Sequence, residues 1–253
     1  MNADFLRRAK IATQAFSDIA NWREVLPNAA AGNVVTEIRL RSGTVLTAPP
    51  EVGLWSHFSD TWYHRSYTRY FAVPADSVVV DIGANVGVFS LFAARRARVV
   101  YSLEPASSNF ECLVKNTSKV PSIVPLKCAC AARDGRAMLD LSASPVAFSL
   151  KTSSSSATQE TVDVISLETL FKRYKIERCD FLKLDCEGAE FEIIWESDPA
   201  LLKRVSRIVM EYHDHLSTQY SHVELLEKLK SLGYQASSYM PNGTYGMIAA
   251  IRP

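Results

Sequence analysis

The chain has 253 residues, which is long for one average domain and short for two. Its composition, with 47% apolar and 22% charged residues, is typical of a globular protein that buries a core without disulfides or metals. The net charge of +1 excludes a bulk electrostatic attraction to nucleic acid or to an anionic membrane.

Neither export nor membrane insertion is predicted. Residues 1–16 contain basic side chains but no apolar signal region, and no apolar run approaches the roughly 20 residues that span a bilayer. The five cysteines match no zinc or two-cysteine redox spacing, and their apolar neighbours are typical of buried thiols in a reducing compartment. We therefore predict a cytoplasmic protein without a membrane span.

Residues 1–73 are predicted to form an N-terminal cap of helices and one β-hairpin. Apolar side chains in residues 5–19 recur at helical spacing, and the stretch 33–49 alternates like a hairpin with a turn at Ser42 and the glycine after it. The next stretch, 54–71, is dense in aromatic residues, among them Trp62, Tyr63 and Tyr67. We expect a helix that covers the core there, and the same helix can form a wall or lid over a cofactor pocket.

Residues 74–253 alternate strand and helix, which predicts a parallel sheet covered on both faces. The expected strands span 77–82, 98–105, 122–131, 178–188 and 205–213, and the expected helices span 86–96, 107–119, 167–174, 189–197 and 222–233. Short strands or a hairpin around a serine-rich loop (153–156) interrupt the alternation. Two closing strands, 234–240 and 245–253, are joined by an Asn-Gly turn, so the last strand is antiparallel to its neighbours. The predicted fold class is α/β, doubly wound and mostly parallel.

The first strand of this domain leads into the glycine-spaced turn VVVDIGANVGVFSL, which begins at Val78. Ligands bind outside the carboxyl ends of the strands in such sheets, so we expect four turn residues at the ligand: Asp81, Gly83, Asn85 and Gly87. The glycines let the backbone approach a ligand without a Cβ in the way. The turn lacks the G-x-G-x-x-G spacing of dinucleotide sites, and its acid favours a cationic or hydroxylated group over a diphosphate.

A second acid, Glu104, ends the next strand 23 residues after Asp81. An acid about 20 residues beyond such a turn commonly binds the hydroxyl pair of a ribose. Each acid also has a purely structural alternative, which is a helix cap for Asp81 and a solvated strand end for Glu104. Together they favour a ligand with a ribose and a positive charge but no phosphate, and S-adenosylmethionine has these features.

The segment KLDCEGAE at the end of the fourth strand supplies the candidate catalytic residues Lys183, Asp185 and Glu187. Alternate residues of a strand share a side, so Lys183 and Asp185 face the same way. Glu187 and Glu190 open the following helix, where the alternative role is stabilisation of the helix dipole. His213, at the end of the fifth strand, is the candidate base, because an unperturbed imidazole accepts a proton near neutral pH. The alternative is a surface histidine.

A metal-assisted reaction is a further alternative to a free base. Asp185, Glu211 and His213, with His215 nearby, could ligate a divalent ion such as magnesium. Their spacing matches no fixed metal motif, so the sequence by itself predicts no metal site.

Three blocks of the sequence resemble class I S-adenosylmethionine-dependent methyltransferases, and the third is similar to the FkbM family in particular. They are VVVDIGANVGVFSL, VVYSLEPASSNFECLVKN and ISLETLFKRYKIERCDFLKLDCEGAEFEII, within a resemblance that covers residues 78–213 and the terminal hairpin. The resemblance implies a seven-stranded Rossmann-like sheet and O-methylation of a small molecule or sugar. It also implies that Pro105 and Asn109 lie beside the adenosine and that the loop from Ala131 to Asp134 passes the adenine.

We therefore predict a domain at 74–253 that binds S-adenosylmethionine and methylates a hydroxyl of a sugar or another small-molecule acceptor. A non-catalytic module that binds this cofactor is one alternative, but it would not need the acids of the fourth strand or His213. A nicotinamide-dependent oxidoreductase is another, but it would need a G-x-G-x-x-G turn and an all-parallel sheet. No continuous basic stripe appears, so we predict no nucleic-acid substrate. The sequence makes no prediction of the oligomeric state.

Overall fold

The computed structural model describes residues 3–140, 150–151, 159–217 and 219–253 of the chain. Its main strands are β3 (Val78–Ile82), β4 (Val99–Leu103), β5 (Ile123–Leu126), β10 (Phe181–Leu184), β11 (Arg207–His213), β12 (Gln235–Asn242) and β13 (Tyr245–Ile251). They form a seven-stranded sheet in the order β12-β13-β11-β10-β3-β4-β5. Neighbours from β11 to β5 pair in parallel, whereas β13 is antiparallel to both β11 and β12. The predicted mostly parallel sheet with an antiparallel last strand is confirmed.

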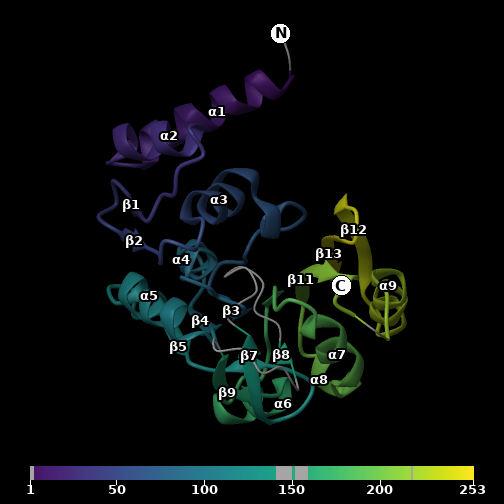
Figure 1. The fold of residues 1–253 in the computed structure, drawn as a ribbon. Helices are drawn as coiled ribbons and strands as arrows, with labels where there is room; N and C mark the ends of the chain where they lie inside the picture. The colour runs from purple at the N-terminus through teal and green to yellow at the C-terminus, as the bar shows by residue number, and fades with distance from the viewer. Residues whose placement is uncertain (1–2, 141–149, 152–158, 218) are drawn as a thin grey trace.

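Helices cover both faces of this sheet. The helices that follow its strands are α4 (Val88–Ala94), α5 (Ser107–Thr117), α6 (Leu167–Arg173), α7 (Ala189–Glu196), α8 (Pro199–Leu202) and α9 (His222–Ser231). The sheet crosses Figure 1 diagonally from β12 to β5, with α4 and α5 on one side and α6, α7 and α9 on the other. Every residue of β3 and β10 is buried, as expected of apolar parallel strands between two helical layers. None of the described helices is both long enough and apolar enough to cross a bilayer.

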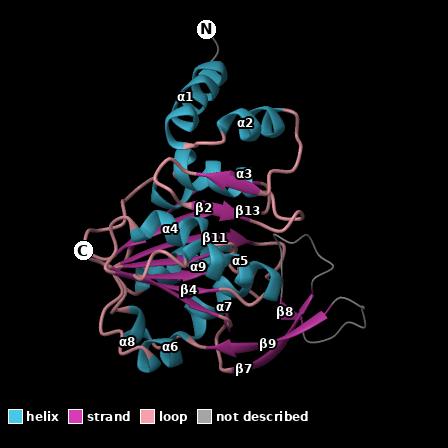
Figure 2. Cartoon of the chain, turned by 90° about the vertical axis from the view of Figure 1, so that its left-hand side faces the viewer, coloured by secondary structure: helices cyan, strands magenta, loops and turns pink. Residues whose placement is uncertain are grey.

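The N-terminal cap packs on the α4 side of the sheet and shares its core. It comprises α1 (Ala3–Asp18), α2 (Trp22–Ala30), the hairpin β1 (Glu37–Arg39) and β2 (Val45–Thr47), α3 (Leu54–Ser59), the π-helical turn η1 (Asp60–His64) and the 3-10 turn η2 (Ser66–Thr68). Phe58 of α3 is fully buried in the same apolar cluster as Val79 and Phe89. Figure 2 shows α1 and α2 at the end of the cap that is farthest from the sheet. The predicted first helix and hairpin are confirmed. The helix expected over 54–71 is wrong in its extent, because α3 ends at Ser59 and the chain continues as η1 and η2. The domain boundary at residue 73 stays a prediction.

The region that interrupts the alternation forms a second sheet, at the lower right of Figure 2. Its order is β6-β9-β7-β8, from β6 (Ala129–Cys130), β7 (Gly135–Asp140), β8 (Leu150–Lys151) and β9 (Gln159–Ile165). The antiparallel pairing of β7 with β9 confirms the predicted short strands, and the serine-rich loop lies outside the described residues.

The expected strand at 122–131 is wrong in its extent. It splits because the N–H of Cys128 donates to the carbonyl of Leu126 at 3.0 Å, which turns the chain out of the main sheet. Ala129 and Cys130 then pair in parallel with β9. The continuous apolar stretch therefore serves two sheets rather than one.

Asn116 of α5 ties the hairpin of the cap to the main domain. Its side chain is buried, its Oδ1 accepts the N–H of Thr47 at 2.9 Å, and its Nδ2 donates to the carbonyls of Thr47 and Val86, both at 2.8 Å. One amide therefore supplies partners to three backbone groups in two separate segments.

Replacing Asn116 with Ala is expected to lower the free energy of unfolding by about 2–4 kcal/mol, because buried backbone groups lose their partners. Urea unfolding followed by circular dichroism measures the difference. Asn33→Ala is the matched control, since Asn33 is exposed and its side chain makes a solvent-exposed hydrogen bond to that of Asn28, and it should change stability by less than about 0.5 kcal/mol. An equal loss in both variants would contradict this role for Asn116.

Candidate active site

A pocket opens at the carboxyl ends of β3, β4 and β10, the edge of the sheet for which the sequence predicts a ligand. Its wall includes Gly83 and Asn85 from the turn after β3, Glu104 after β4 and Asp185 after β10. Tyr67 of η2, in the N-terminal cap, forms part of another wall of the pocket. The pocket is therefore built by both parts of the chain.

Gly83 brings the ends of β3 and β10 into contact. Its φ of 75° lies in the left-handed region, and a Cβ at this position would lie 1.8 Å from the carbonyl oxygen of Asp185. Asn85 is also left-handed, with a φ of 50°, a conformation that asparagine adopts more readily than most residues. Its N–H donates to Glu104 at 2.8 Å. The turn thus lets the backbone at Gly83 lie against that of Asp185, and it directs the N–H of Asn85 at Glu104.

Glu104 and Asn109 present acceptor atoms at the pocket. The backbone N–H groups of Asn85 and Ala106 each donate to one oxygen of Glu104, at 2.8 and 2.9 Å. The side chain is buried, and burial raises the pKa of Glu104 to about 7. Asn109 is 2% exposed, and its Oδ1 has no hydrogen-bond partner among the described residues. Buried polar atoms are normally paired, so an unpaired one on a pocket wall indicates a ligand group that donates to it.

A buried lysine holds the ends of β3 and β10 together. Lys183 Nζ lies 3.1 Å from Asp81 Oδ1 and 3.6 Å from Asp185 Oδ2, and it donates to the carbonyl of Gly83 at 2.9 Å. Burial by itself would lower the pKa of Lys183, but the two carboxylates outweigh it and hold the pKa above its usual value. The lysine therefore keeps its charge at the base of the pocket.

Tyr67 orients Asp185. Its hydroxyl donates to Asp185 Oδ2 at 2.6 Å, and its ring packs edge-on against Phe89 with 5.4 Å between the centroids. Burial would raise the pKa of Asp185, but Lys183 and the tyrosine hydroxyl outweigh it and hold the pKa below its usual value. Asp185 is therefore an ionised carboxylate whose Oδ2 is held by two side chains.

His213 is held by a fully buried carboxylate. Glu190 Oε1 lies 3.0 Å from His213 Nδ1 and also accepts the His213 backbone N–H at 3.1 Å. Burial would lower the pKa of His213, but Glu190, followed by Glu187 and Glu211, outweighs it and raises the pKa to about 9. The imidazole is therefore perturbed by the acids around it, and its role as a base stays a prediction.

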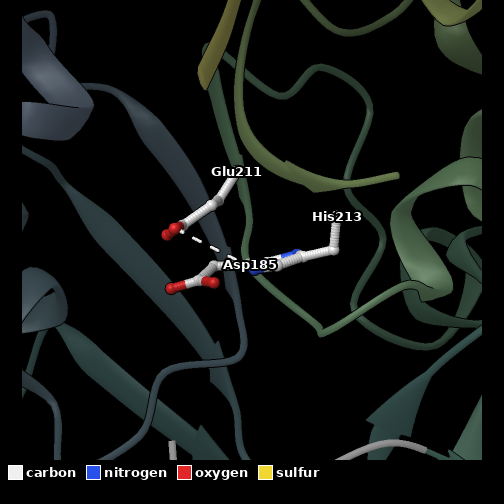
Figure 3. Close-up of side chains that lie close together, drawn as sticks. All are labelled: Asp185, Glu211 and His213. Carbon is white, nitrogen blue, oxygen red and sulfur yellow. Dashed lines mark ion pairs between the residues drawn. The ribbon is translucent and has the colours of Figure 1, made fainter. Parts of the chain in front are cut away.

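Acidic side chains converge beside the pocket at the ends of β10 and β11. Asp185, Glu211 and His213 have ligand-type atoms within 4.8 Å of one another, and their side chains point toward one another in Figure 3. Glu187 Oε2 lies 3.4 Å from His213 Nε2. Burial raises the pKa of Glu187 to about 7 and that of Glu211 to about 8. The predicted group of Asp185, Glu211 and His213 is therefore brought together in space.

Most of the predicted site residues lie on the pocket wall, namely Gly83, Asn85, Glu104, Pro105, Asn109, Lys183, Asp185 and Glu187. Others do not. Asp81 faces Lys183 beneath the wall. A Cβ on Gly87 would lie 2.7 Å from Leu113, so this glycine allows α4 to pack on α5. Ala131 does not line the pocket, because its N–H donates to the carbonyl of Ile165 and holds it at the second sheet. His213 lies behind Glu187.

Some wall residues were not predicted from the sequence. His57 and Thr61 come from α3 and η1, Cys128 comes from the chain between the two sheets, and Cys130 comes from β6. The aromatic density of residues 54–71 indicates this segment but not which side chains face the ligand. Trp62, for example, stacks on Phe58 in the core with 4.8 Å between the centroids.

Comparisons with known proteins agree with this architecture. The family described as "Methyltransferase FkbM domain" matches residues 81–236. The hexuronic acid methyltransferase AglP of Haloferax volcanii is 26% identical over 139 residues, which cover 54% of this chain and 56% of AglP. The crystal structure of the methyltransferase FkbM from Methylobacillus flagellatus KT aligns with a TM-score of 0.50 and 14% identity, over 76% of this chain and 47% of that one. The chain thus spans about half the length of these relatives.

Replacing Gly83 with Ala is expected to cost about 3 kcal/mol or more of folding free energy, since the new Cβ would overlap a backbone carbonyl and the φ is unfavourable for alanine. Thermal and urea unfolding measure the loss. Gly135→Ala is the control, because a Cβ at Gly135 meets nothing within 4 Å. Wild-type stability in the Gly83 variant would show that the two strand ends can separate without cost.

Proposed function

The chain belongs to the FkbM methyltransferase family, and on that premise we propose that it transfers a methyl group from S-adenosylmethionine to a hydroxyl group of a sugar or another small molecule. The observation that carries this proposal is Glu104. Its buried carboxylate lies on the pocket wall, and each of its oxygens is held by one backbone N–H. Each oxygen keeps further lone pairs, so the pair can accept the two hydroxyl hydrogens of a ribose.

The other residues of the pocket fit the same cofactor. The unpaired Oδ1 of Asn109 can accept a hydrogen bond from the adenine amino group. Gly83 and Asn85 expose the backbone of the turn toward the amino-acid end, and Asp81 supports this region through Lys183 rather than by contact. When bound, the cofactor supplies a methyl group that is attached to a positively charged sulfur. Once the methyl group is transferred, this sulfur remains in the cofactor as a neutral thioether.

We assign the orientation of the acceptor to Asp185 and the residues that hold it. Tyr67 and Lys183 both contact Oδ2, and Oδ1 has no hydrogen bond in the described part of the chain, so it can accept the hydrogen of an acceptor hydroxyl. Glu187, on the same wall, and His213 behind it extend the polar path along which that proton can leave. Positioning of this kind can supply roughly 7–11 kcal/mol of a reaction barrier.

A sugar or similar hydroxylated molecule is the acceptor that these features favour. AglP, whose name assigns it a hexuronic acid, is 26% identical to this chain over 139 residues. The acids beside the pocket would repel the phosphates of a nucleic acid, and the net charge of +1 offers no compensating attraction. We retain a cytoplasmic location as a prediction, which is compatible with five cysteines that are all free thiols.

Isothermal titration calorimetry should show binding of S-adenosylhomocysteine and none of NAD. Glu104→Gln should weaken S-adenosylhomocysteine binding at least tenfold, because one acceptor oxygen becomes a donor amide that faces the ribose. Glu111→Gln on the exposed face of α5 is the matched control and should bind like the wild type. Binding of NAD in place of S-adenosylhomocysteine would refute the proposed function.

The affinity for S-adenosylhomocysteine should depend on pH through Glu104. The carboxylate form accepts the ribose hydroxyls, and this form is lost as the pH falls through about 7. The dissociation constant should therefore rise about tenfold between pH 8 and pH 6. Calorimetry across this range tests it, and Glu104→Gln should remove most of the dependence. An affinity that is the same at both pH values would contradict a titrating Glu104 at the ligand.

A further inference from the structure

We propose that Asp185, Glu211 and His213 form a binding site for one divalent cation of the magnesium or manganese class. The site itself follows from the contacts of these three residues, while its use, which is to bind the hydroxyl of the methyl acceptor, rests on the proposed function.

The spacing of the three side chains suits a shared ion. Asp185 follows β10, and Glu211 and His213 lie on one side of β11, the parallel neighbour of β10. Their ligand-type atoms all lie within 4.8 Å of one another. Ligands about 2.0–2.6 Å from one ion lie roughly 3–5 Å apart, so an ion could bridge them with small side-chain movements.

His213 presents a single nitrogen to this point. Glu190 is fully buried and holds Nδ1 at 3.0 Å, while its other oxygen accepts the N–H of Gly188 at 2.8 Å. Nε2 makes no hydrogen bond within the described residues, and its nearest carboxylate oxygens belong to Glu187 at 3.4 Å and Glu211 at 3.9 Å. The ring is 8% exposed. A histidine whose second nitrogen is fixed by a buried carboxylate is the usual arrangement of a metal ligand.

Asp185 is held in the same manner. Tyr67 and Lys183 both contact Oδ2, at 2.6 and 3.6 Å, and Oδ1 has no hydrogen bond within the described residues. Two of the three ligands thus have one atom anchored by a buried or half-buried partner and a second atom free. Outer contacts of this kind orient ligands and are worth about 10–100-fold in metal affinity.

The local charge balance also favours a cation. His213 has four acids around it, which are Glu187, Glu190, Glu211 and Asp185. The nearest cation, Lys183, lies closer to Asp81, at 3.1 Å, than to Asp185, at 3.6 Å. Two carboxylates and one imidazole, with room for water, suit manganese or magnesium rather than a thiolate-bound ion.

A cation at this point lies beside the pocket wall that Asp185 and Glu187 share. An acceptor hydroxyl that ligates it would lose its proton more readily, and the proton would pass to water or a neighbouring carboxylate. The acceptor oxygen would then form its bond to the methyl carbon as the carbon–sulfur bond breaks, and the sulfur would take the electron pair and leave as a thioether.

The test uses the full chain, stripped with a chelator and titrated with Mn²⁺ alone. Calorimetry and the loss of the electron paramagnetic resonance signal of free Mn²⁺ should both show one ion per chain. Glu211→Gln and His213→Gln should each weaken binding at least tenfold. Glu192→Gln, on the exposed face of α7, is the control and should bind like the wild type.

Circular dichroism and S-adenosylhomocysteine binding, measured on the same preparations, verify that each variant is folded. Absence of saturable Mn²⁺ binding to the wild type, or binding that neither variant weakens, overturns the cation site. Such a result together with intact S-adenosylhomocysteine binding would leave the proposed function standing. Mn²⁺ binding without S-adenosylhomocysteine binding would refute the proposed function and keep the cation site.

Discussion

The pocket depends on one buried cation, the ammonium group of Lys183. It contacts Asp81 of β3, the carbonyl of Gly83 and Asp185 after β10, so a single charge joins two strand ends and the turn between them. A buried ammonium is costly unless it is paired, and here the pairing is completed by Ser90, which donates to the second oxygen of Asp81 at 2.6 Å, and by Ser102 behind it. The positions of Asp81 and Asp185 are therefore fixed by their contacts with this ammonium group. Asp81 is thereby a structural partner of Lys183, whereas the sequence predicts that it lies at the ligand.

The N-terminal cap is part of the site because its last turn is held at both sides. Tyr67 donates to Asp185, and the neighbouring Ser66 accepts a hydrogen bond at 2.7 Å from Tyr239 of β12, which is distant in the sequence. Phe58 and the rest of α3 share the apolar cluster of α4 and β3. Residues 54–68 are therefore tied to the sheet as one wall of the pocket, and three of their side chains line it, namely His57, Thr61 and Tyr67.

Sequence reasoning succeeded where a signal is local and periodic. Continuous apolar runs predicted β3, β10 and β11, and the closing hairpin predicted the antiparallel β13. It failed at residues 122–131, because an apolar run does not show where a strand turns into another sheet. It also could not show that Glu190 holds His213 and raises the pKa of the ring, since that contact joins residues 23 positions apart on different elements.

By itself, the sequence determined the fold class, the edge of the sheet where the pocket opens and the identity of the family, because these depend on residue types at short spacings. Only the tertiary structure decided which acids face the pocket, which one neutralises Lys183, and which atoms of Asp185 and His213 stay unpaired. The reason is physical: the charge state and direction of a side chain depend on its burial and on partners from distant segments, and these exist only once β3, β10, β11 and the cap are packed together.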